Sequence, residues 1–253
     1  MAMPVSLPMS NCHIDQEHPH WPYVLCLASS FDYDAAHAHQ VVCLSLMLFD
    51  ELQDLHGRDE TARFLLQTAA LLHDIGRCDG SPNHHKASQR YIVQAPLPFG
   101  ATHRRIIGCA ARYHRGPLPR EGHRHYRRLD EPDRALTCLL GGILRLADGL
   151  DHSHRSLVTQ LTCEVRGARM QVCCATRRPL PWSHARAADK VSLLEQVLGR
   201  PILIDCAREG DLTLRQADQV RSWLVRHRRR PPAALADART VNDVVEEPAG
   251  SAA

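Results

Sequence analysis

Apolar residues recur at helical spacing through most of the chain before residue 155. Asp34 can cap a long helix that continues to about Leu55. Gly57 separates it from a second helix, which Asp59 can cap and which ends near His73. The predicted buried stripe of the first of these helices comprises His37, Val41, Leu44, Leu48, Leu52 and Leu55.

Four further helices are expected, each bounded by proline, glycine or polar residues. They span about Trp21 to Ser30, His84 to Gln94, Thr102 to Tyr113 and Pro132 to Leu150. The last one contains the pair Gly141-Gly142, and a basic loop over 116–128 precedes it. The first 155 residues therefore predict a helical bundle.

After residue 155 the apolar pattern changes to alternation. Ser156 to Val165 and Met170 to Cys174 predict a β-hairpin. A helix over Ser183 to Leu198, a strand over Ile202 to Ile204 and a helix over Thr213 to Val225 should follow. The predicted fold is mainly α with a small C-terminal α/β module. Its parts are a lead-in (1–17), a helical domain (18–155), the small module (156–226) and a disordered tail (227–253).

Composition narrows the functional classes. The net charge is only +3 with neutral histidines, so no specific nucleic-acid partner is expected. The ten cysteines form no CxxC pair and the N-terminus does not resemble a signal peptide, which predicts a reducing cytoplasm. Cys43, Cys109 and Cys138 should then be small buried hydrophobes. No apolar stretch is long enough to span a membrane.

The pair His73-Asp74 is the strongest functional signal, because it ends the leucine-rich run 64–72. An imidazole and a carboxylate are costly to bury side by side, and a metal ion compensates both. His37 and Asp148 lie on the apolar stripes of their own helices. Three helices thus offer donors from their core sides, with His39 as an alternative to His37 that points toward nearly the opposite face. Further candidate ligands downstream are His85, for which the neighbouring His84 could substitute, and His114.

At these residues the chain resembles the HD superfamily of metal-dependent phosphohydrolases. More narrowly, it is similar to the C-terminal half of the exopolyphosphatase and guanosine pentaphosphate phosphohydrolase family over roughly residues 20–205. The segments that carry this resemblance are His37-Ala38-His39-Gln40-Val41, Leu48-Phe49-Asp50, Ala69-Ala70-Leu71-Leu72-His73-Asp74-Ile75-Gly76, His84-His85-Lys86-Ala87-Ser88, Tyr113-His114-Arg115 and Leu144-Arg145-Leu146-Ala147-Asp148-Gly149-Leu150-Asp151.

The resemblance implies an HD-type bundle that hydrolyses a phosphate ester or anhydride with metal-activated water. It also implies a homodimer and a polyphosphate or nucleotide-type substrate. Full-length members of that family carry an actin-like half with glycine-rich phosphate loops, and none precedes Asp34 here. The alternative function is therefore a catalytically silent polyphosphate- or nucleotide-binding or dimerisation module that works with a separate catalytic protein.

The expected cofactor is one or two divalent transition-metal ions. Imidazole and carboxylate donors suit Mn, Fe, Zn or Co, and Mg is less expected because it prefers oxygen. Similarity to binuclear HD enzymes implies that Asp74 would bridge two ions. The predicted metal ligands are His37, His73, Asp74, His85, His114 and Asp148.

Basic residues near these ligands are candidates for phosphate recognition, because guanidinium groups match phosphate oxygens. Lys86 and Arg115 are expected to bind substrate and neutralise developing charge, with Arg77 and Arg112 as further binding residues. His114 could bind phosphate instead of metal. Asp151 is a candidate proton acceptor, or alternatively a cap at the helix end.

Overall fold

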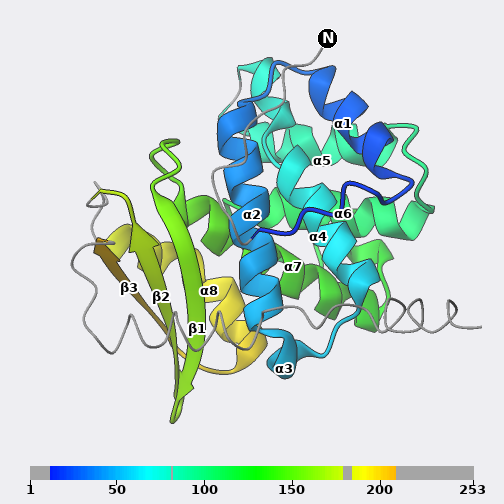
Figure 1. The fold of residues 1–253 in the computed structure, drawn as a ribbon. Helices are drawn as coiled ribbons and strands as arrows, with labels where there is room; N and C mark the ends of the chain where they lie inside the picture. The colour runs from blue at the N-terminus through cyan, green and yellow to red at the C-terminus, as the bar shows by residue number, and fades with distance from the viewer. Residues whose placement is uncertain (1–11, 81, 179–183, 209–253) are drawn as a thin grey trace, which may run out of the picture.

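The computed structural model describes residues 12–80, 82–178 and 184–208 (Figure 1). The predicted mainly α fold with a small α/β module is confirmed. The helical part comprises α1 (Trp21–Ser29), α2 (Ala35–Glu51), α3 (Gln53–His56), α4 (Glu60–Leu72), η1 (Ile75–Asp79), α5 (His84–Gln94), α6 (Ala101–Tyr113), η2 (Tyr126–Arg128) and α7 (Glu131–Leu150).

A three-stranded sheet lies beside the bundle, with α8 packed on α7 (Figure 1). Strand β1 (Val158–Arg166) pairs antiparallel with β2 (Arg169–Thr176), as the hairpin prediction requires. Helix α8 (His184–Leu198) then leads to β3 (Ile202–Arg208), which pairs parallel with β2. The predicted helix over 213–225 and the tail over 227–253 lie outside the described residues.

Helix capping sets where the helices that lead to His37 and His73 begin. The Asp34 carboxylate accepts a hydrogen bond from the His37 amide at 3.1 Å, and the Asp59 carboxylate accepts one from the Ala62 amide at 2.9 Å. The prediction of one helix to Leu55 is wrong, because α2 ends at Glu51 and α3 is a separate turn. The break leaves Leu55 at 39% exposure, whereas the rest of the predicted stripe is buried.

The prediction of buried cysteines is confirmed for Cys109, but Cys138 is only half-buried and Cys43 needs a further correction. Cys43 is not a free thiol but forms a disulfide with Cys12, which joins the lead-in to α2. The Gln67 side chain holds the same segment by accepting from the Asp15 amide at 2.8 Å and donating to the Asp15 carbonyl at 3.0 Å. The described end of the lead-in is thus fixed across α2 and α4, an arrangement that the aperiodic sequence did not indicate.

Among the described residues, no helix has the length and apolar content needed to cross a membrane.

Glycines in α7 allow α8 to approach closely. A Cβ at Gly142 would lie 3.1 Å from the backbone nitrogen and Cα of Leu194, which is closer than nearly all real contacts of this kind. Seven residues further along α7, a Cβ at Gly149 would lie 2.8 Å from Cγ of Lys190. Because glycine has no side chain at these two positions, α8, and with it the small module, packs directly against the bundle.

Substituting Gly142 with valine should separate α7 from α8, since backbone atoms of α8 cannot move aside individually. We expect a loss of unfolding free energy of about 1–3 kcal/mol, the usual cost of overpacking. Thermal and denaturant unfolding would measure it. Gly122→Ala is the control, because a Cβ at Gly122 meets no atom within 4 Å. Equal stability of the two variants would contradict this account of the interface.

Candidate metal site

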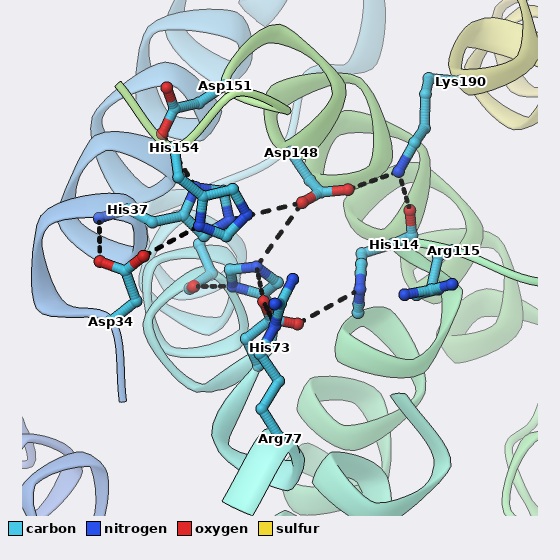
Figure 2. A network of polar contacts seen from close by, with 12 residues as sticks. Asp34, His37, His73, Arg77, His114, Arg115, Asp148, Asp151, His154 and Lys190 are labelled. Atoms are coloured by element: carbon cyan, nitrogen blue, oxygen red, sulfur yellow. Dashed lines mark hydrogen bonds and ion pairs between the residues drawn. The ribbon is translucent and has the colours of Figure 1, made fainter. Parts of the chain in front are cut away.

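Three helices deliver imidazoles and carboxylates to one buried cluster (Figure 2). His37 lies in the first turn of α2, His73 caps the C-terminus of α4, and Asp148 lies near the end of α7. His37 Nε2 is 3.5 Å from Asp148 Oδ1. His73 Nε2 is 3.8 Å from the same oxygen and 3.6 Å from Asp74 Oδ2. The predicted convergence of donors that are far apart in sequence is therefore present.

A second group of imidazoles faces the other oxygen of Asp74. His84 Nε2 lies 3.1 Å and His114 Nε2 lies 3.5 Å from Asp74 Oδ1. Gly76 makes this approach possible, because a Cβ there would lie 2.3 Å from the carbonyl oxygen of His84. The Gly76 amide also donates to the Ser88 hydroxyl at 2.9 Å. Gly76, two residues after Asp74, thus allows η1 to pack closely against α5.

Hydrogen bonds on the far side of three rings fix their orientation. With Nδ1 protonated, His73 donates to the Ala70 carbonyl at 2.8 Å and His114 donates to the Ala111 carbonyl at 2.6 Å. His37 Nδ1 donates to the Asp151 carboxylate at 2.8 Å. Each ring therefore turns Nε2 toward the carboxylates, which is how metal-binding histidines are usually held.

Burial and neighbouring charges shift the pKa values of the residues in the cluster. Burial lowers the pKa of His73, and it lowers that of His114 well below its ordinary value. Burial acts the same way on His37, but hydrogen bonds to Asp148 and Asp151 outweigh it and raise the pKa of His37 to about 9. The pKa values of Asp74 and Asp148 are lowered in spite of burial, by the surrounding imidazoles and by Arg77 and Lys190. Both carboxylates are therefore ionised.

The donor atoms form three overlapping groups within which they all lie within 4.8 Å of one another. Nε2 of His73 is buried and has no hydrogen-bond partner among the described residues, whereas Nε2 of His37 faces Asp148 Oδ1 at 3.5 Å. With its proton on Nδ1, His73 turns an unprotonated Nε2 toward oxygens of Asp74 and Asp148, and these atoms repel each other unless a cation stands between them. The donor set thus fits a divalent ion. The groups are His37, His73 and Asp74; His73, His114 and Asp148; and Asp74, His84 and His114.

The sequence left two choices of candidate ligand open, and the positions of the side chains decide both. His37 lies in the cluster, whereas the half-buried His39 does not. His84 lies in the cluster, whereas the predicted ligand His85 belongs to none of the three groups. Residues on a helix are about 100° apart, so the neighbours His84 and His85 point in different directions, and His37 and His39, two positions apart, point to nearly opposite faces.

A cavity of about 290 Å³ opens beside the cluster. Arg77 and Arg115 line it, as the sequence predicted for substrate-binding residues. Lys86 is exposed and lies outside its lining, and Arg112 instead donates to the Gln89 side chain at 2.9 Å. The full lining is Arg77, His114, Arg115, Gly116, Arg145, Asp148, His152, His154 and Lys190.

Asp151 lies behind His37 rather than at the cavity. One of its oxygens accepts from His37 Nδ1 and the other accepts from the Ser156 amide at 2.8 Å. With both oxygens engaged and only 1% of the residue exposed, it is badly placed for the proton-acceptor role expected of it. Its geometry is that of a carboxylate that orients a ligand histidine.

Sequence analysis assigned no role to several polar residues of the site, among them Lys190, Arg145 and His154. Lys190 of α8 pairs with Asp148 Oδ2 and donates to the His114 carbonyl at 3.2 Å. Arg145 donates to the carbonyls of Tyr113 and Gly116. His154, at φ +54°, stacks on His37 with ring centroids 3.7 Å apart. Spacing could have revealed Arg145, three residues before Asp148 on α7, but no sequence pattern links Lys190 or His154 to the ligands.

A comparison with known protein families finds a match for the segment that contains the site. A family model described as Ppx/GppA phosphatase, domain III, matches residues 23–193. No curated protein matches the chain. The matched segment holds every residue of the cluster and of the cavity lining, and it spans well over half of the sequence. The chain therefore belongs to the Ppx/GppA phosphatase family, in the part of it described as domain III.

Proposed function

We propose that this protein is a metal-dependent phosphohydrolase of the HD type. One observation carries the proposal: buried imidazole nitrogens, among them the unpartnered Nε2 of His73, converge on two ionised carboxylates beside a cavity lined by cations. The carboxylates and imidazoles suit a divalent ion, and the cations suit an anionic substrate. The phosphatase family to which the chain belongs agrees with this combination.

The donor set supports one or two ions of Mn, Fe, Co or Zn. Its mixture of nitrogen and oxygen donors makes Mg²⁺, which prefers oxygen, a poorer fit. Asp74 presents Oδ2 toward His73 and Oδ1 toward His84 and His114, so its carboxylate could serve two adjacent positions. In this proposal His84 replaces His85 as a ligand.

Bound in this donor set, a divalent ion would supply Lewis acidity and a water activated at neutral pH. The protein's own residues would hold and orient the reactants. Asp151 and the carbonyls of Ala70 and Ala111 keep the imidazoles in one tautomer. Arg77 and Arg115 line the cavity, where their guanidinium groups would pair with phosphoryl oxygens and neutralise charge that develops during cleavage.

The proposed substrate is a phosphate ester or anhydride of the polyphosphate or nucleotide type, and the proposed assembly is a homodimer. The phosphatase family supports the substrate class, and the homodimer is what the resemblance noted in the sequence implies. The cavity is compatible with this class because it combines positive side chains with an open approach to the donor cluster.

A substrate panel tests the proposal. Wild-type protein should hydrolyse one or more phosphomonoesters, phosphodiesters, nucleotides or polyphosphates with Mn²⁺, Fe²⁺, Co²⁺ or Zn²⁺, and less with Mg²⁺. Asp74→Ala should lower kcat/KM by about a thousandfold or more, because it removes the carboxylate shared by two donor groups. The matched control is Asp79→Ala, a nearby carboxylate that bonds Tyr91 and Arg90 at the surface.

Two outcomes would count against the enzyme. If Asp74→Ala and Asp79→Ala were equally active, the cluster would not be the catalytic site. If wild-type protein bound metal and phosphate compounds but hydrolysed none of them, the alternative function of a binding module would replace the hydrolase.

Metal affinity should rise with pH, because His37 must lose a proton to become a ligand. Its pKa of about 9 means that His37 is protonated at neutral pH without metal. A bound ion displaces that proton, so the apparent association constant should rise by about tenfold per pH unit below the pKa and level off above it. Calorimetric titrations with Mn²⁺ at pH 6–9, in buffers with different protonation enthalpies, would report both the slope and the released proton.

Asp151→Asn is the informative comparison for this titration. The Asp151 carboxylate raises the pKa of His37, so the variant should begin to level off at lower pH. A pH-independent affinity in the wild type would show that His37 is not a ligand.

A further inference from the structure

Lys190 enters the site from the small module rather than from the bundle. Its ammonium pairs with Asp148 Oδ2 and donates to the His114 carbonyl at 3.2 Å (Figure 2). The side chain lines the cavity and is 20% exposed. The stem is thus packed while the charged end remains accessible from the cavity.

Helix α7 is shaped to admit this side chain. Gly149 directly follows Asp148, and a Cβ there would lie 2.8 Å from Cγ and 3.1 Å from Cβ of Lys190. The bare glycine surface leaves the space through which the lysine stem passes. Together with the close seat of α8 at Gly142, this delivers the ammonium to one defined place.

The other cations of the cavity are engaged differently. Arg145 donates to two backbone carbonyls, and Arg77 pairs with Asp74. An ammonium has three donors, and the contacts of Lys190 to Asp148 and His114 use two of them. Lys190 can therefore give its third donor to a ligand in the cavity without breaking the contacts that position it.

The charge of Lys190 is better suited to an anion than to supporting a metal. It lies on the oxygen of Asp148 that faces away from His37 and His73, so it competes electrostatically with any ion held by that carboxylate. The same positive charge favours an oxyanion that approaches through the cavity.

We propose that Lys190 binds a phosphoryl oxygen of the substrate, so that the small α/β module completes the substrate site. This inference rests on the proposed phosphohydrolase function. It assigns a binding role to a residue outside the bundle, and it means that the helical part alone would bind phosphate more weakly.

The sequence offers a natural control, because Lys86 and Lys190 are the only lysines in the chain. Lys86 is exposed and lies outside the cavity lining. The pair therefore allows the removal of one ammonium inside the cavity to be compared with the removal of one outside it.

The test measures two affinities by calorimetry on the full chain: that of Mn²⁺ for the protein, and that of inorganic phosphate for the Mn²⁺-loaded protein. Lys190→Met should weaken phosphate binding by about tenfold or more, the value of a charge-assisted hydrogen bond. It should leave Mn²⁺ affinity unchanged or tighter, because a like charge has gone. Lys190→Arg should retain part of the phosphate affinity, and Lys86→Met should change neither.

Each contrary result has a distinct meaning. If Lys190→Met bound phosphate like the wild type, or lost Mn²⁺ and phosphate together, Lys190 would not be a substrate-binding residue. If wild-type protein bound none of Mn²⁺, Fe²⁺, Co²⁺ and Zn²⁺, the proposed function would fail first and the inference with it.

A measurement on the wild-type protein avoids dependence on the folding of variants. Acetylation of amines, followed residue by residue by mass spectrometry, should be slowed at Lys190 by phosphate in the Mn²⁺-loaded protein. Lys86 should react at the same rate with and without phosphate. Equal reactivity of Lys190 in both conditions would overturn the proposal.

Discussion

Two ionised carboxylates buried among imidazoles are the constraint on which the site depends. Asp74 and Asp148 are largely removed from water, and such charges are costly unless cations compensate them. Arg77 pairs with one, Lys190 pairs with the other, and His37 lies beside Asp148. The two buried carboxylates thus depend on positive groups that η1, α8 and α2 supply.

Helix ends and glycines bring the side chains of the site together. His37, His73 and His84 lie at helix termini, where the chain can present a side chain without burying a polar group along a whole apolar face. Gly76 lets η1 approach α5, and Gly142 lets α8 approach α7. Because both approaches involve backbone contacts, the positions of the donors follow from the packing of helices rather than from flexible loops.

Sequence patterns predicted the features that are set within a single helix, such as its buried face and its cap. His37 and Asp148 could be assigned because they share the stripes of buried apolar neighbours, and Asp34 and Asp59 cap their helices as expected. The choice of His84 over His85 depends on how α5 is turned against η1, which no spacing in α5 encodes. Lys190 and the Cys12–Cys43 disulfide join segments distant in the chain, so a single sequence carries no signal for them.

Charge balance connects the proposed metal with the proposed substrate. In the described residues Arg77 and Lys190 pair with Asp74 and Asp148, so the carboxylates offset part of the positive charge that lines the cavity. A divalent ion would make the cluster positive and strengthen its attraction for phosphate in a partly buried cavity. By reciprocity a bound phosphate would hold the ion more tightly. Lys190 pairs with Asp148, a proposed metal ligand, and also lines the cavity. Its position would therefore link the occupancy of the metal site to the binding of phosphate.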